Sequence, residues 1–186
     1  WYYNPMVFPK NDHPINNNLE AVRFQFTSSM DTLANDYKKH ILLESSPLSR
    51  TEGVPKPINL DIINTPPDKN IYNDGNQILG VLIEGSFNST FLNRVKPIKL
   101  GKPIDQGPEN KMIILSDGDL IRNQIRNGRP LELGYDKWTN NFFGNKEFLI
   151  NCLNYLLDDT GLINIRNKEV TIPFLDEEKI NDQKTK

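Results

Sequence analysis

The chain has 186 residues, a formal net charge of −2 and a mean hydropathy of −0.57. This length suffices for one domain with a full core, and the slight negative charge, with Lys and Arg scattered along the chain, argues against a nucleic-acid partner. The one cysteine and two histidines exclude an intrachain disulfide and a structural zinc site, and no apolar stretch approaches the roughly 20 residues of a membrane helix.

The first part of the chain contains short strand patterns between polar loops. Residues 1–18 are rich in aromatic residues, Pro and Asn, and we expect this loop to cover other parts of the protein, because exposed aromatic rings are costly. His13 precedes a proline and is expected to be extended. Alternation of apolar and polar residues predicts strands at 22–26 and 58–63, and 41–46 also has the pattern of a strand.

The second part contains two strong apolar runs and one helical pattern. The runs at 78–83 and 112–116 are typical of strands that are buried on both faces, as in parallel sheets. Asn145 is a good helix cap, and the apolar residues over 148–157 follow at helical spacing. Gly161 suits the left-handed exit of that helix.

Together these patterns favour an α/β domain with a central, mainly parallel sheet flanked by helices. Cys152 lies inside the apolar helical pattern and is expected to be a buried core residue. The segments 162–165 and 170–174 could form a closing strand pair. We expect residues 1–175 to form a single domain, followed by a charged tail over 176–186.

Three predicted strands end in polar residues that could form a site. Glu44 and Glu84 each follow an apolar run, and Asp117 and Asp119 follow the run at 112–116. If the strands are parallel neighbours, these carboxylates meet at one edge of the sheet, where ligands of such sheets bind. Clustered carboxylates raise one another's pKa or bind a cation such as Mg²⁺.

A structural interpretation competes with this one, and we favour it. Asp-Gly is a turn dipeptide, and Ser or Asp after a strand often caps a helix. Arg50 and Arg94 each follow a strand end, and each could pair with the carboxylates or bind an anionic ligand; pairing is the preferred role. The candidate ligand- or partner-binding residues are Glu44, Glu84, Arg94, Ser116, Asp117 and Asp119.

Sequence signatures of catalysis are missing. The chain has no phosphate-binding loop, no dinucleotide-binding fingerprint and no nucleophile elbow. His13 and His40 have no identifiable Ser or Cys partner, which argues against a catalytic triad. The sequence therefore predicts no catalytic residue, no metal and no cofactor.

Several blocks in combination resemble the GldG family of gliding-motility-associated ABC transporter auxiliary, or substrate-binding, proteins. They lie at 11–15, 22–26, 29–33, 42–46, 81–87, 144–148 and 162–166. The resemblance implies a flavodoxin-like or glutamine-amidotransferase-like fold. Amidotransferases of that fold carry a Cys on a nucleophile elbow, whereas Cys152 lies within a helical pattern, so no catalytic residue is carried over.

The resemblance also implies a cellular location and partners for the protein. We expect the extracytoplasmic domain of a membrane-anchored auxiliary subunit, on the periplasmic face of the inner membrane, with the permease and ATPase subunits as partners. The tail over 176–186 would lead toward a membrane helix. Its expected function is non-enzymatic binding or assembly in gliding motility or export. The alternatives are a sensor of a sugar or peptide at the sheet edge, and a degenerate hydrolase that uses Glu84, Asp117 or Asp119.

Overall fold

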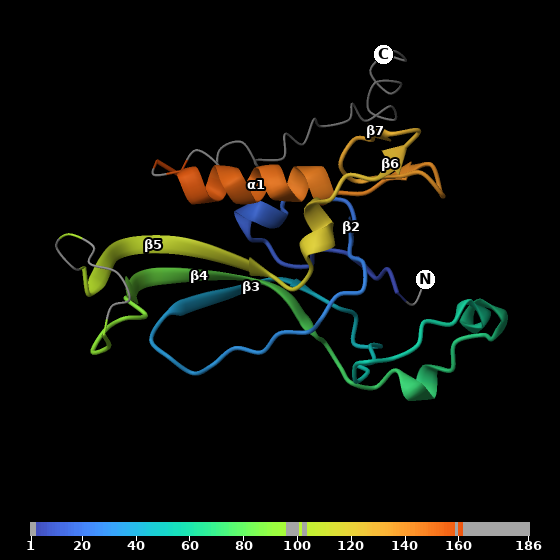
Figure 1. The fold of residues 1–186 in the computed structure, drawn as a ribbon, viewed down its shortest axis with the longest axis horizontal. Helices are drawn as coiled ribbons and strands as arrows, with labels where there is room; N and C mark the ends of the chain where they lie inside the picture. Colours follow the sequence, from blue (N-terminus) through green and yellow to red (C-terminus); the bar gives the residue numbers. More distant parts are fainter. Residues whose placement is uncertain (1–2, 96–100, 102–103, 159, 162–186) are drawn as a thin grey trace, which may run out of the picture.

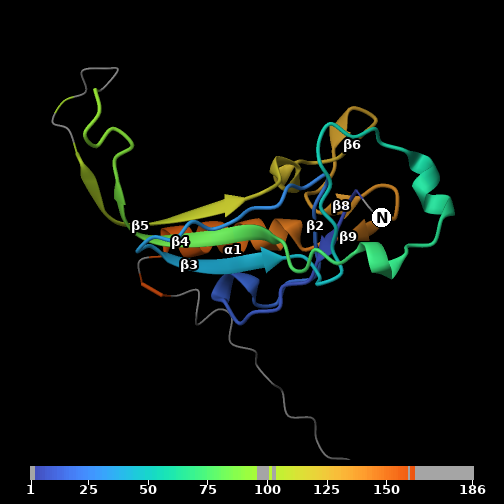
Figure 2. The same ribbon diagram turned by 90° about the horizontal axis from the view of Figure 1, so that it is seen from below.

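The centre of the molecule is a three-stranded sheet with a helix across one face (Figure 1). Its strands are β3 (Lys38–Glu44), β4 (Ile78–Asn88) and β5 (Gln106–Leu115), in the order β3-β4-β5. The helix is α1 (Asn145–Leu157). Figure 2, seen from below, shows the strands in front of α1. The computed structural model describes residues 3–95, 101, 104–158 and 160–161.

Short elements surround this centre. Two-residue strands pair as β1 (Met6–Val7) with β2 (Val22–Arg23), β6 (Ile125–Arg126) with β7 (Arg129–Pro130), and β8 (Tyr135–Asp136) with β9 (Asn141–Phe142). Four 3-10 helices complete the described part: η1 (Pro14–Asn16), η2 (Leu60–Asn64), η3 (Lys69–Ile71) and η4 (Gly118–Ile121). The segment that carries η2 and η3 extends away from the sheet in both views.

The predicted central parallel sheet flanked by helices is wrong. β4 runs antiparallel to both β3 and β5, and α1 is the one α-helix in the described part of the chain. The arrangement is therefore neither flavodoxin-like nor glutamine-amidotransferase-like. The prediction failed because the apolar run of β5 is not buried on both faces: Met112 and Ile114 are 45% and 41% exposed, while Ile113 and Leu115 pack against the core. Apolar residues on both faces hid the alternation of an antiparallel strand.

Other predicted elements had mixed outcomes. The expected strand at 58–63 is wrong, because the chain forms η2 there and the Asn59 side chain caps it by accepting a hydrogen bond from the Asp61 N–H. Polar Asn and Asp side chains favour such local caps over sheet pairing. The strand expected over 22–26 is reduced to the two residues of β2. His13 is extended, with φ −67° and ψ 137°, as its position before proline predicts.

The core lies between the sheet and α1. Phe148 and Cys152, one helical turn apart, are both buried and belong to a cluster with Leu42, Leu82 and Ile15. The prediction that Cys152 is a buried core residue is confirmed, and burial raises the pKa of its thiol to about 12. The remaining buried members of the cluster are Val7, Val22, Phe24, Leu43, Leu79 and Leu120.

The ends of α1 only partly follow the prediction. The residue at the N-cap is Gly144, and Asn145 is the first helical residue, so its predicted capping role is wrong. Gly161 has a φ of +76°, as expected for a left-handed residue beyond the helix. The predicted strands at 162–165 and 170–174 and the predicted tail lie outside the described residues, and the extent of the domain stays a prediction.

Candidate functional site

The predicted binding residues are not gathered at one edge of the sheet. Because the strands are antiparallel, Glu84 pairs with Lys38 at the start of β3, whereas Glu44 lies at the other end, beside Ile78. Arg94 is exposed in a turn that follows β4. The geometry therefore separates Glu44 from Glu84, although a ligand-binding role for any one of the six residues stays a prediction.

Asp117 forms a turn at the end of β5. It is the N-cap of η4, where its Oδ1 accepts a hydrogen bond from the Asp119 N–H at 2.8 Å. Its Oδ2 accepts from the Gln25 N–H at 2.6 Å, and next to it the Ser116 and Thr27 hydroxyls share a 2.8 Å hydrogen bond. These contacts join the end of β5 to the segment after β2, which supports the structural interpretation of this sequence.

Glu84 is the centre of a polar cluster between the sheet and α1. Its carboxylate lies 3.5 Å from Lys38 Nζ and 3.6 Å from His40 Nε2, and it accepts a 2.9 Å hydrogen bond from the Tyr155 hydroxyl. The His13 ring packs against His40 and Tyr155, with centroid distances of 5.4 and 5.0 Å. His40 thus lies beside the Glu84 carboxylate, and His13 joins the same half-buried layer through its ring contacts with His40 and Tyr155.

The environment shifts the pKa of these groups. Burial opposes ionisation of Glu84, but the hydrogen bond from Tyr155 and the charge of Lys38 outweigh burial and lower its pKa. Burial and the neighbouring His40 lower the pKa of His13, although Glu84 acts in the opposite sense. Burial raises the pKa of Tyr155 to about 12, so this phenol keeps its proton and donates a hydrogen bond to Glu84 throughout the neutral range.

A lysine of β5 completes the contact with the helix. Lys111 Nζ donates to the carbonyls of Tyr155 and Asp158, both at 3.1 Å, and it lies 4.7 Å from the Tyr155 ring centroid. A cation at the C-terminal end of a helix complements its dipole. Within the described ranges, no three His, Cys, Asp or Glu residues lie together so as to hold a metal. The cluster thus stabilises the packing of α1 through hydrogen bonds and charge.

Sequence reasoning named Glu84 but missed its partners. The period of two along a strand places Lys38 and His40 on the same face of β3, and this signal was present in the sequence. What was absent was the register that sets both of them opposite Glu84 and Leu82 of β4. His13 reaches the cluster from the N-terminal loop, and no local pattern indicates that contact.

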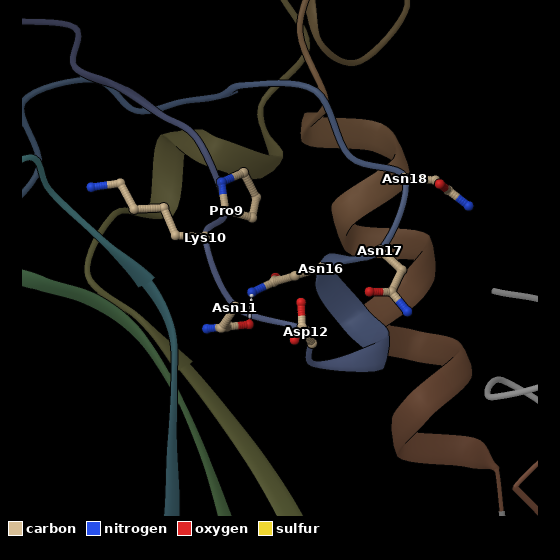
Figure 3. Close-up of a pocket in the computed structure, with 7 residues that line it drawn as sticks. All are labelled: Pro9, Lys10, Asn11, Asp12, Asn16, Asn17 and Asn18. Atoms are coloured by element: carbon tan, nitrogen blue, oxygen red, sulfur yellow. Dashed lines mark hydrogen bonds between the residues drawn. The ribbon is translucent and has the colours of Figure 1, made fainter. Parts of the chain in front are cut away.

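The N-terminal loop carries two adjoining depressions, the smaller of which lies against β3. A cavity of about 400 Å³ is shown in Figure 3. It is lined by Pro9, Lys10, Asn11, Asp12, Asn16, Asn17 and Asn18. A second, of about 250 Å³, shares residues 9–11 and adds Phe8, Ile41, Leu42 and Glu44. Of the predicted site residues, Glu44 therefore lines a depression, where Asn76 Nδ2 donates to its carboxylate at 2.9 Å.

Two asparagines fix this loop to the strand. Asn11 Nδ2 donates to the Ile41 carbonyl at 2.7 Å. Asn16 Nδ2 donates to the Leu42 carbonyl at 2.7 Å and to Asn11 Oδ1 at 2.6 Å. These side-chain amides bind the backbone carbonyls of Ile41 and Leu42 on the edge strand β3. The N-terminal loop is therefore fixed to the edge of the sheet.

The face of the sheet opposite α1 is apolar and partly open. Ile41, Val81 and Ile114 are register partners across the three strands, and their side chains share that face by the alternation of strands. Ile41, Met112 and Ile114 are 40%, 45% and 41% exposed. Figure 1 shows α1 and η1 above the sheet, whereas the segment from β2 to β3 passes below it. We call Ile41, Met112 and Ile114 the open face.

Comparison with known proteins identifies the family. A family model described as an ABC-type uncharacterized transport system matches residues 1–152. No curated protein and no solved structure matches the chain. None of the helices in the described residues is long and apolar enough to cross a membrane. The family match covers well over half of the chain, which therefore belongs to this family of ABC-type transport-system proteins.

Proposed function

We propose that this member of the ABC-type transport-system family is a non-enzymatic assembly domain that docks on the permease at the periplasmic face of the inner membrane. The ATPase subunit would belong to the same complex, and the parent protein would be membrane-anchored. Family membership supports a place in such a transport system. The resemblance of blocks such as 81–87 to the GldG family supports the narrower assignment to gliding motility or a related export process.

The open face carries this proposal. Its three large apolar side chains are each about two-fifths exposed. Ile41 stands on β3 and Met112 and Ile114 stand at successive outward positions on β5, with Val81 of β4 between Ile41 and Ile114. Contiguous exposed apolar side chains on a folded domain mark surfaces for protein contact. Covering a side chain that is two-fifths exposed contributes about 1 kcal/mol, since full burial contributes roughly 1.5–3 kcal/mol. The matching partner surface would be apolar and uncharged.

The polar features of the chain support binding rather than catalysis. Glu84 is held by Lys38 and Tyr155, and Asp117 is held by backbone N–H groups. Carboxylate oxygens that already accept hydrogen bonds from fixed donors have fewer lone pairs left for a substrate. Both carboxylates thus serve contacts within the fold.

The test is capture of the complex from membranes that contain the full-length protein. We would compare the wild-type chain with the double variant Met112→Lys, Ile114→Lys, and quantify the permease and ATPase subunits that are recovered. Because both side chains are about two-fifths exposed, the fold should tolerate the change, whereas a desolvated lysine in an apolar contact is strongly unfavourable. We expect at least a tenfold loss of recovered permease.

Leu153→Lys is the matched control. Leu153 is 57% exposed on α1, on the other side of the sheet, so this variant adds one charge to an exposed apolar site away from the open face. It should leave recovery unchanged. Equal recovery with all variants, or equal loss with the control, would overturn the proposal that the open face contacts the permease.

A further inference from the structure

We infer that the depressions beneath the N-terminal loop bind a neutral, polyhydroxylated ligand of the carbohydrate class. This inference does not rest on permease docking, because it concerns the edge of β3 rather than the open face. The two cavities, of about 400 and 250 Å³, adjoin through shared residues at positions 9–11. Ligand pockets typically range over roughly 300–1,000 Å³, so the pair has room for one or two sugar rings.

The larger depression presents polar groups that are free to bind. In Figure 3, Asp12 and Asn17 lie on the two sides of η1, and Lys10 and Asn18 point away in opposite directions. In the part of the chain that the structure describes, the side chains of Asp12 and Asn17 have no hydrogen-bond partner of their own. A carboxylate accepts only, and an amide both donates and accepts. Two neighbouring hydroxyls of a sugar match this pair, since one donates to Asp12 and the other accepts from Asn17.

The framework behind these groups is rigid. Asn16 is 6% exposed, and its amide nitrogen is bound to Asn11 and to the Leu42 carbonyl. Its Oδ1 is buried and lacks a hydrogen-bond partner among the described residues. A buried acceptor of this kind favours a nearby hydroxyl donor over an apolar or acceptor-only ligand. Asn16 therefore lines the depression with an amide whose nitrogen is fixed and whose oxygen is unsatisfied among the described residues.

The smaller depression supplies an apolar surface and a further acceptor. Phe8 is 63% exposed, and it lines the cavity together with Ile41 and Glu44. An exposed aromatic ring can pack against the C–H face of a sugar ring, while the carboxylate of Glu44 accepts from its hydroxyls. The exposed Phe8 ring together with short polar side chains suits a sugar ring, which is apolar on its faces and polar at its rim.

Charge and backbone geometry disfavour other ligand classes. The two depressions carry the carboxylates of Asp12 and Glu44 against the ammonium of Lys10, so an anionic ligand would meet net repulsion. A peptide that binds by strand addition needs free carbonyls on the edge strand. Those of Ile41 and Leu42 are already bound by asparagine amides.

The test is a titration of the ¹⁵N-labelled full chain, followed by NMR of the backbone and asparagine side-chain amides. The probes are D-glucose, D-mannose, N-acetyl-D-glucosamine and cellobiose, with trialanine and inorganic phosphate as the competing classes. We expect at least one saccharide to shift signals of residues 8–18 and 41–44 in a saturable manner. Asp12→Ala and Asn17→Ala should each weaken its binding about three- to tenfold, the loss of one hydrogen bond.

Phe8→Ala tests the contact between the aromatic ring and the sugar, and it should weaken binding to a similar degree. Asp36→Ala is the matched control. Asp36 is an exposed carboxylate before β3, and its loss should leave the affinity unchanged. The inference is overturned if no saccharide shifts these signals at tens of millimolar. It is also overturned if trialanine or phosphate shifts them instead, or if Asp12→Ala and Asn17→Ala bind as the wild type does. The result does not depend on the permease-recovery experiment, so saccharide binding and permease docking are tested separately.

Discussion

Asn145 provides the sharpest test of the fold, because sequence and structure assign it different roles. As a helix cap, Asn145 would be replaceable by Asp, since both are good capping residues. In the structure its Oδ1 accepts from the Arg23 N–H at 2.9 Å, and its Nδ2 donates to the carbonyls of Arg23 and Leu120 at 2.8 and 3.2 Å. The residue is 5% exposed. It joins α1 to β2 and η4 through three hydrogen bonds.

The expected cost follows from this count. At about 1 kcal/mol for each hydrogen bond, Asn145→Ala should lower the free energy of unfolding by about 3 kcal/mol. Asn145→Asp keeps one acceptor but loses both donors, and it places a carboxylate near two carbonyl oxygens, so it should cost at least about 2 kcal/mol. For a chain of this size, each kcal/mol shifts Tm by about 2–4 °C.

Thermal and urea unfolding of the full chain, followed by circular dichroism, measure both variants. Asn151→Ala is the control, because Asn151 Nδ2 makes one hydrogen bond, at 3.0 Å to the Ile15 carbonyl, and should cost about 1 kcal/mol. If Asn145→Asp is as stable as the wild type, and Asn145→Ala costs no more than the control, Asn145 acts only as a cap and the three-way contact is refuted.

Two further predictions concern pH and a close backbone approach. The pKa of His13 is lowered from 6.5 in the folded state, so below about pH 6.5 the unfolded chain binds more protons and stability falls; the lowered pKa of Glu84 adds a loss below about pH 4.5. Urea midpoints from pH 8 to 4 should show both slopes, and His13→Gln should flatten the first; an unchanged slope would refute the assignment. Gly144→Ala should cost about 1–3 kcal/mol by overpacking, because a Cβ there would lie 2.7 Å from the Glu20 carbonyl oxygen. Gly53→Ala, with open space around it, is the matched control in the same melts, and equal stability of the two variants would contradict that contact.

The sequence predicted the elements with strong local signals. The apolar spacing of 148–157 predicted α1, and it also predicted that Cys152 is buried. The apolar runs at 78–83 and 112–116 located the first half of β4 and the end of β5. In each of these segments the spacing of the apolar residues shows which side chains face the core. This spacing can be recognised within one or two helical turns, or within a few residues of a strand.

Long-range geometry could not be predicted in the same way. The direction of β4 relative to its neighbours depends on how the long connections return, and an apolar run fits either direction. Asn11 and Asn16 looked like loop residues, yet their amides bind the edge of β3. Asn145 looked like a cap because the same side chain that caps a helix can bind a distant backbone. Polar side chains have several possible partners, and the fold selects among them.

Strand direction also decides where the functional surfaces lie. Parallel strands would have brought Glu44 and Glu84 to one edge, whereas the antiparallel register places Glu84 against α1 and leaves Glu44 beside the N-terminal loop. Ile41 connects the two proposed surfaces, since its carbonyl is bound by Asn11 while its side chain lies on the open face. A change at Ile41 would therefore disturb both surfaces. Variants of β5 and of the N-terminal loop each alter one surface, so permease docking and saccharide binding can fail separately.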